Sequence, residues 1–227
     1  MFRLITMRHA AAGALLLTIT ALIGCGGPVL GLVATAVVPE YKQVKVTADY
    51  RGLDNQVVAV MVNLNEYAYA QYPQALKDMS WALAKELRAN VPGISLVNPD
   101  DVVAFQDANP YWNTLRYSQL ISRMKVDRIV LVDVLQYSMH EPGNKHILQG
   151  LIVGDVKVIE APRSDAGEHT SRDALAYSKT VEARYPKDNP IGIIDGDQRS
   201  VEVATLKEFS RTAGQLFYDH QELRPNR

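Results

Sequence analysis

The feature that most constrains the fold is an apolar run inside the segment from Asp127 to Ser138. Its central portion, residues 129–132, reads Ile-Val-Leu-Val and leaves no polar position for solvent. Successive side chains of a strand point to opposite faces, so a run of this kind indicates a strand that is covered on both faces. The segment therefore predicts the centre of a sheet.

Helices and strands alternate around this segment. The helix that follows Pro73 carries one apolar stripe at three- and four-residue steps, formed by Leu76, Met79, Leu83 and Leu87. The predicted elements in chain order are strands 41–50 and 57–64, helix 73–90, strand 94–97, helices 98–109 and 115–124, strands 127–138, 146–160 and 175–185, and helix 200–220. This order predicts an α/β protein: a single sandwich of two or three layers with a mixed sheet, a late antiparallel meander and a C-terminal helix.

Strand 146–160 alternates in character, with four apolar residues on one parity: Ile147, Leu151, Val153 and Ile159. Asn98 and Pro99 predict a helix start, and Asp100 and Asp101 favour its positive end. The alternative for the two aspartates is a metal or acid–base pair. Asp133 lies inside an apolar strand, which a bulge, a lysine or arginine partner, or a buried functional acid would explain.

The start of the chain has the pattern of an export signal. Arg3 and Arg8 precede an apolar run at residues 10–23, which is shorter than the roughly 20 residues needed to span a bilayer. Leu-Ile-Gly-Cys at residues 22–25 ends in the only cysteine of the chain and resembles the lipobox of bacterial lipoproteins. The resemblance implies acylation of Cys25 and attachment to the membrane. An ordinary signal peptide or an uncleaved anchor is the alternative.

The lipobox resemblance also implies a location and a division of the chain. Gly26 follows the cysteine where an inner-membrane retention signal has Asp, which predicts an outer-membrane lipoprotein whose body faces the periplasm. The predicted regions are a signal peptide at 1–24, a lipid-anchored tether with a possible edge strand at 25–55, an α/β domain at 56–220 and a polar tail at 221–227.

Composition and motifs point away from several functional classes. The net charge of −1 offers no clustered basic surface, so no nucleic-acid partner is expected. The sequence has no Gly-x-Ser-x-Gly, no phosphate-cradling or dinucleotide-binding glycine motif and no His-Glu-x-x-His, so no cofactor and no resident metal are expected. Two weak metal candidates are His140-Glu141 with His146, beside a predicted turn, and residues 195–197, Asp-Gly-Asp, in a predicted loop.

Aromatic residues gather in two places and are the best candidates for partner contacts. The candidate residues are Tyr67, Tyr69 and Tyr72, before the first helix, and Tyr111 and Trp112 further along. Exposed tyrosine and tryptophan bring a large amphipathic area to protein interfaces. The alternative is that these side chains seal the ends of the sheet.

Several segments resemble one bacterial superfamily. A lipobox, a strand at 57–62 (Val-Val-Ala-Val-Met-Val) and a long helix are similar to the curli-secretion lipoprotein family, the lipoprotein activators of penicillin-binding proteins and the amino-terminal domain of TolB. Residues 124–132 resemble the helix-to-strand segment of that group, and residues 156–161 and 177–181 resemble its late meander. The chain departs from the pattern at Asp133 and at residues 161–163. Charged residues in the late hairpin disfavour a membrane pore.

These observations favour a non-enzymatic, lipid-anchored periplasmic protein that binds or scaffolds envelope partners. One alternative is a subunit of an oligomeric outer-membrane secretion or assembly complex, which would self-associate. Another is a periplasmic hydrolase that uses scattered Asp and His side chains, which would require a pocket where titratable groups converge.

Overall fold

The structure is a computed structural model that describes residues 41–160, 174–189 and 191–225. The predictions for Cys25 and the export segment, for the tether up to residue 40, and for residues 161–163 fall outside the described residues. None of the helices in the described ranges is long and apolar enough to cross a membrane.

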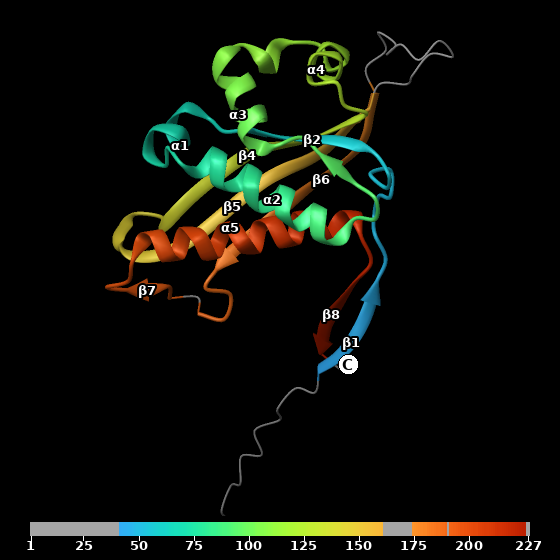
Figure 1. Ribbon diagram of the computed structural model, residues 1–227. Coiled ribbons are helices and arrows are strands. Elements are labelled where there is room, and N and C mark those ends of the chain that lie inside the picture. The colour runs from blue at the N-terminus through green and yellow to red at the C-terminus, as the bar shows by residue number, and fades with distance from the viewer. Residues whose placement is uncertain (1–40, 161–173, 190, 226–227) are drawn as a thin grey trace, which may run out of the picture. The chain divides into compact units, whose positions relative to one another are not determined.

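A mixed sheet forms the centre of the domain (Figure 1). Its strands are β2 (Val57–Asn63), β3 (Ser95–Leu96), β4 (Arg128–Glu141), β5 (Asn144–Glu160) and β6 (Ala174–Tyr185). They lie in the order β3-β2-β4-β5-β6, and β7 (Ile193–Ile194) adds to β5. β2 pairs in parallel with β3 and β4, whereas β4, β5 and β6 form an antiparallel meander. The predicted fold class is therefore confirmed.

The helices cover the two faces of this sheet to different extents. α2 (Ala75–Asn90) and α5 (Gln198–Gly214) lie side by side on one face, where Leu83 and Phe209 are buried with the strands (Figure 1). α3 (Pro99–Ala108) and α4 (Tyr117–Met124) pack on the other face, around Met61 and Ile121. Ile159 is the residue of β5 that joins the buried cluster beneath α3 and α4, so this layer covers mainly β2 and β4.

The apolar run in β4 occupies the position that the sequence predicts. Val130 and Val132 belong to the core beneath α2 and α5, whereas Ile129 and Leu131 belong to the core beneath α3 and α4. Because the strand alternates between two covered faces, every residue of the run must be apolar.

The prediction for β5 concerns its odd-numbered residues, but the side of the strand that faces the core carries the even-numbered ones. The even positions are buried: Leu148, Gly150, Ile152, Gly154, Val156 and Val158. Of the four predicted residues only Ile159 is fully buried, and the others are half-buried on the face that α3 and α4 leave partly open. Glycines at two of the buried positions concealed the inward face, since they add no hydrophobicity to the pattern.

α3 begins at the residues where the sequence predicts a helix start. The Asn98 side chain accepts a hydrogen bond from the backbone N–H of Asp100 at 3.0 Å, and Pro99 is the first residue of α3. Asp100 also bonds Lys77 at 3.0 Å and the indole of Trp81 at 3.1 Å, so its contacts are structural. The sequence did not predict the short elements α1 (Glu66–Gln71) and β7 or the 3-10 turn η1 (Trp112–Thr114).

The predicted end of the chain is wrong. The last helix ends at Gly214 instead of His220, a 3-10 turn η2 (Gln215–Phe217) follows, and His220–Pro225 forms β8 in place of a polar tail. β8 pairs antiparallel with β1 (Tyr41–Val46) in a separate two-stranded ribbon. Leu216 and Phe217 turn into the core at this point, which ends the helical path.

Candidate interaction surface around α1

α1 follows directly after β2 and is held at its first turn by Asn65. The Asn65 side chain accepts a hydrogen bond from the N–H of Ala68 at 2.8 Å, and Ala68 itself is buried. Such a cap satisfies one of the free donors at a helix start. A helix of six residues is unstable alone, so this cap and the buried side chains behind it are what fix α1 in place.

The three tyrosines of this segment divide into exposed and buried groups. Tyr67 is 76 % exposed and Tyr69 is half-exposed, whereas Tyr72 is 4 % exposed. The Tyr72 hydroxyl accepts a hydrogen bond from the backbone N–H of Met139 at 3.3 Å, and burial raises the pKa of Tyr72. Tyr72 therefore seals the end of the sheet, and Tyr67 and Tyr69 keep the role of candidate partner contacts.

Tyr72 rests on a second buried tyrosine that joins the sheet to α5. Its ring centroid is 4.9 Å from that of Tyr137, and the Tyr137 hydroxyl donates to Glu202 Oε1 at 2.9 Å. Arg199 Nη1 lies 2.9 Å from the other oxygen of Glu202. Burial, followed by the negative charge of Glu202, raises the pKa of Tyr137, because both disfavour the phenolate.

A hollow of about 470 Å³ lies between α1 and the β4–β5 hairpin. Tyr67 and Gln71 line it from α1, and His140, Glu141 and Lys145 are among its residues from the hairpin. Titratable side chains of both signs meet here beside an exposed aromatic ring, an arrangement suited to binding a polar peptide surface.

Leu135 supplies the apolar part of this hollow. The β4–β5 register shifts between Val134 and Gln136, and the unpaired Leu135 is 57 % exposed. A β-bulge leaves its extra residue outside the ladder and redirects its side chain. The bulge thus places a leucine in solvent on the same side of the domain as the Tyr67 ring.

Tyr111 and Trp112 are not brought to this surface. Tyr111 is 78 % exposed on the connection between α3 and α4, and Trp112 is buried in the core beneath those helices. Neither residue lines the hollow at α1. The prediction that both belong to one set of partner-binding aromatics is therefore wrong for Trp112, whose ring is used for packing.

Asp133 has the lysine partner that the sequence led us to consider. Lys157 Nζ lies 2.7 Å from Asp133 Oδ2, and Asn63 Nδ2 donates to Asp133 Oδ1 at 2.9 Å. The hydrogen bond to Asp133 is the main cause of a raised pKa for Lys157. Both carboxylate oxygens are thus occupied within the sheet.

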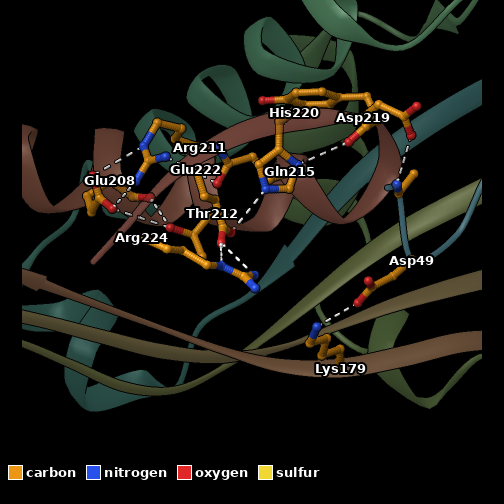
Figure 2. A network of polar contacts seen from close by, with 12 residues as sticks. Asp49, Lys179, Glu208, Arg211, Thr212, Gln215, Asp219, His220, Glu222 and Arg224 are labelled. Atoms are coloured by element: carbon orange, nitrogen blue, oxygen red, sulfur yellow. Dashed lines mark hydrogen bonds and ion pairs between the residues drawn. The ribbon is translucent and has the colours of Figure 1, made fainter. Parts of the chain in front are cut away.

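A larger polar network joins the end of α5 and the β1–β8 ribbon to the sheet (Figure 2). Lys179 Nζ bonds Asp49 at 2.6 Å, and hydrogen bonds from Lys179 and Tyr177 lower the pKa of Asp49. Asp219 accepts from the N–H of Ala48 at 3.0 Å. These contacts connect segments distant in sequence, and no local pattern predicts them.

Comparison with known proteins gives no assignment to a family. The sequence matches no protein-family profile and no curated protein sequence. Among solved structures, the PelC dodecamer from Paraburkholderia phytofirmans is 11 % identical with a TM-score of 0.41, and the match covers 77 % of this chain and 98 % of that one.

Two lipoproteins are also among the similar structures. Lipoprotein GNA1162 from Neisseria meningitidis is 12 % identical with a TM-score of 0.38, covering 59 % of this chain and 83 % of that one. A minor lipoprotein from Acinetobacter baumannii is 13 % identical with a TM-score of 0.29, covering 75 % and 99 %. At these scores the matches carry no conclusion about function.

The metal candidates do not come together in the described part of the chain, where no three His, Cys, Asp or Glu side chains are grouped to hold an ion. His140 and Glu141 line the hollow at α1, whereas Asp197 caps α5 by accepting from the N–H groups of Arg199 and Ser200.

The site residue that the sequence did not predict is Leu135, because a bulge in an apolar strand has no signature in a single sequence.

Proposed function

We propose that this protein is a lipid-anchored module of the bacterial envelope that binds a protein partner without catalysis, through α1 and the β4–β5 hairpin. Cys25 would carry the anchor in the outer membrane and hold the domain in the periplasm. The observation that carries the binding function is the pairing of two exposed anchors, Tyr67 on α1 and Leu135 at the bulge, across one hollow.

The rigidity of this surface supports the proposal. The rings of Tyr72 and Tyr137 pack against each other beneath it, and the two hydroxyls are hydrogen-bonded to Met139 and Glu202, respectively. A surface that is ordered before binding loses less conformational entropy on association, so its exposed aromatic side chains contribute more of their contact energy to affinity.

Site-specific photo-cross-linking in intact cells tests the binding surface. A photoreactive amino acid at Tyr67 should capture a defined foreign envelope protein, and the same amino acid at Tyr111, which has nearly the same exposure, should not. Equal capture at both positions would contradict the proposed surface. A ladder composed only of this chain would favour the subunit of an oligomeric outer-membrane assembly.

Acylation is tested separately by feeding cells a radioactive fatty acid. The natural chain should be labelled and recovered with the outer membrane, and Cys25→Ala should remain an unlabelled precursor. Label on the Cys25→Ala variant would exclude acylation at this residue. A labelled chain that fractionates with the inner membrane would contradict the outer-membrane location.

A further inference from the structure

A second surface, on the outer side of the two helices that cover the sheet, has the features of a binding groove. α2 and α5 lie side by side there (Figure 1). The groove between them has a volume of about 390 Å³, and its apolar lining consists of Ala82 and Ala89 from α2 and Val203 and Leu206 from α5. A neighbouring hollow of about 520 Å³ shares both alanines and extends to Trp81.

The spacing of these residues fits the groove to a rod-like partner. Ala82 and Ala89 are seven residues apart, which places them on the same face of α2 two turns apart. Val203 and Trp81 are exposed beside these small residues. Two packed helices with small residues between them leave a furrow into which the side-chain ridge of a third helix can fit.

The charge on the rim of the groove is not balanced. Lys85 and Lys207 line it, and Arg88 borders the neighbouring hollow. Within the described residues, none of these three cations has an ion pair or a hydrogen-bond partner.

The carboxylates of the groove are already engaged. Asp78 is paired with Arg199 at 2.5 Å, and Glu86 accepts the hydroxyl hydrogen of Tyr218. Because the Tyr218 hydroxyl is neutral, Glu86 keeps its negative charge, and Lys85, Lys207 and Arg199 against Asp78 and Glu86 leave the groove with an excess of one positive charge. Lys85 and Lys207 lie on the two sides of the apolar floor, which is complementary to a partner with acidic flanks.

We propose that this groove binds an amphipathic helix of a partner protein, whose apolar stripe lies on Ala82, Ala89 and Val203 and whose acidic flanks meet Lys85 and Lys207. Grooves of this kind recognise helices through apolar anchors at three- and four-residue spacing. A flat bilayer would not fill a furrow between two helices, which is why the hollowed shape favours a helix over an anionic lipid surface. This surface is separate from the one formed by Tyr67 and Leu135.

Binding of synthetic helical peptides to the purified full-length protein in neutral detergent tests the proposal. The probes are three fluorescent peptides of about 18 residues, or about five turns, that share one leucine stripe and carry Glu, Gln or Lys on both flanks. Fluorescence anisotropy should rank their affinities Glu first, then Gln, then Lys. Equal affinity for the Glu and Lys peptides would overturn the proposal.

Charge reversal locates the site. The double variant Lys85→Glu, Lys207→Glu should bind the Glu peptide at least about tenfold more weakly and should now bind the Lys peptide, since opposite charges across an interface set specificity. Lys42→Glu, an exposed reversal on β1, is the matched control and should change neither affinity. All variants should melt at the same temperature as the natural chain.

Two results would overturn the assignment. One is unchanged affinity of the Glu peptide for the double variant. The other is binding of anionic phosphatidylglycerol vesicles that the double reversal abolishes, combined with no binding of any peptide, because the cations would then serve a membrane surface.

Discussion

The ammonium group of Lys157 lies 2.7 Å from Asp133, on the neighbouring antiparallel strand, although the residue directly opposite Asp133 is Asp155. Lys157 is the diagonal neighbour of Asp133, two residues from Asp155 on the same strand, so its positive charge lies close to the facing pair of carboxylates. Like charges directly opposite on a sheet are destabilising, and Lys157 offsets that repulsion. Asp155 is in turn bonded by the hydroxyl of Thr180 at 2.6 Å.

This arrangement predicts unequal costs for removing its members. Asp133→Ala should lower the free energy of unfolding by about 1–2 kcal/mol and Lys157→Ala by about 2–3 kcal/mol, because the second change leaves two facing carboxylates. Urea unfolding of both single variants and the double variant measures the coupling. Strictly additive costs would show that the pair does not interact.

The pH dependence of this pair follows from the raised pKa of Lys157. A cation whose pKa is raised on folding contributes stability below its unfolded pKa, about 10.4, and loses that contribution as pH rises through the folded pKa. The stability difference between the natural chain and Lys157→Ala should therefore be constant from about pH 7 to 10 and shrink above it.

The three tyrosines near α1 should respond differently to truncation. Tyr72→Ala should cost about 3–4 kcal/mol, since it empties a buried site. Tyr67→Ala and Tyr69→Ala should change stability by less than about 0.5 kcal/mol, as exposed positions do. Thermal unfolding measures these effects, and loss of partner cross-linking by Tyr67→Ala at unchanged stability would separate a binding role from a structural one. A large drop in stability for Tyr67→Ala would contradict that role.

The layers of this fold could be predicted because their signals are local. The apolar run at residues 129–132 of β4 and the stripe of α2 each require covered faces, and Asn98 with Pro99 marks a helix start within a few residues. The register of β5 could not be predicted in the same way, because Gly150 and Gly154 occupy its inward face and carry no hydrophobic signal.

The candidate sites depended on long-range geometry. The cluster of tyrosines in the sequence made Tyr67 a candidate for partner contacts. Leu135, which lines the same hollow, is exposed because of a bulge in the pairing of β4 with β5. β8 was missed because its charged residues resemble a tail, and only pairing with β1, about 180 positions earlier in the chain, makes it a strand.

The raised pKa of Tyr137 predicts a second loss of stability at alkaline pH. Burial and Glu202 raise the pKa of its hydroxyl, so the folded chain keeps a proton that the unfolded chain loses above about pH 10. Tyr137→Phe should cost about 1.5–3 kcal/mol at pH 7, the range for a hydrogen bond to a charged group. That difference should shrink above about pH 10.

Urea unfolding at several pH values measures the Tyr137 effect. Tyr111→Phe serves as the control, because Tyr111 is exposed and its substitution should leave stability unchanged at every pH. A cost of Tyr137→Phe that stays the same at pH 11 would indicate that ionisation of this hydroxyl is not linked to folding.

Gly150 lies where α5 packs against β5, with Thr205 of the helix directly opposite the position of a Cβ atom. A Cβ atom at this position would lie 1.8 Å from Thr205 Oγ1 and 2.9 Å from Thr205 Cβ, so Gly150→Ala forces the helix away from the sheet. We expect a loss of about 2–3 kcal/mol, as for other overpacked cores. Gly143→Ala is the control: no atom lies within 4 Å of its added methyl, and its φ of +83° leaves only a conformational cost of about 1 kcal/mol.

Thr205→Ala separates this clash from other effects of the Gly150 substitution. Removing the hydroxyl takes away the nearest atom, so the double variant Gly150→Ala, Thr205→Ala should be more stable than the sum of its two single changes predicts, by at least about 0.5 kcal/mol. Differential scanning calorimetry at one pH measures all four chains. Simple additivity would mean that the Gly150 substitution destabilises the strand itself, and the close contact between α5 and β5 would then not be what requires glycine here.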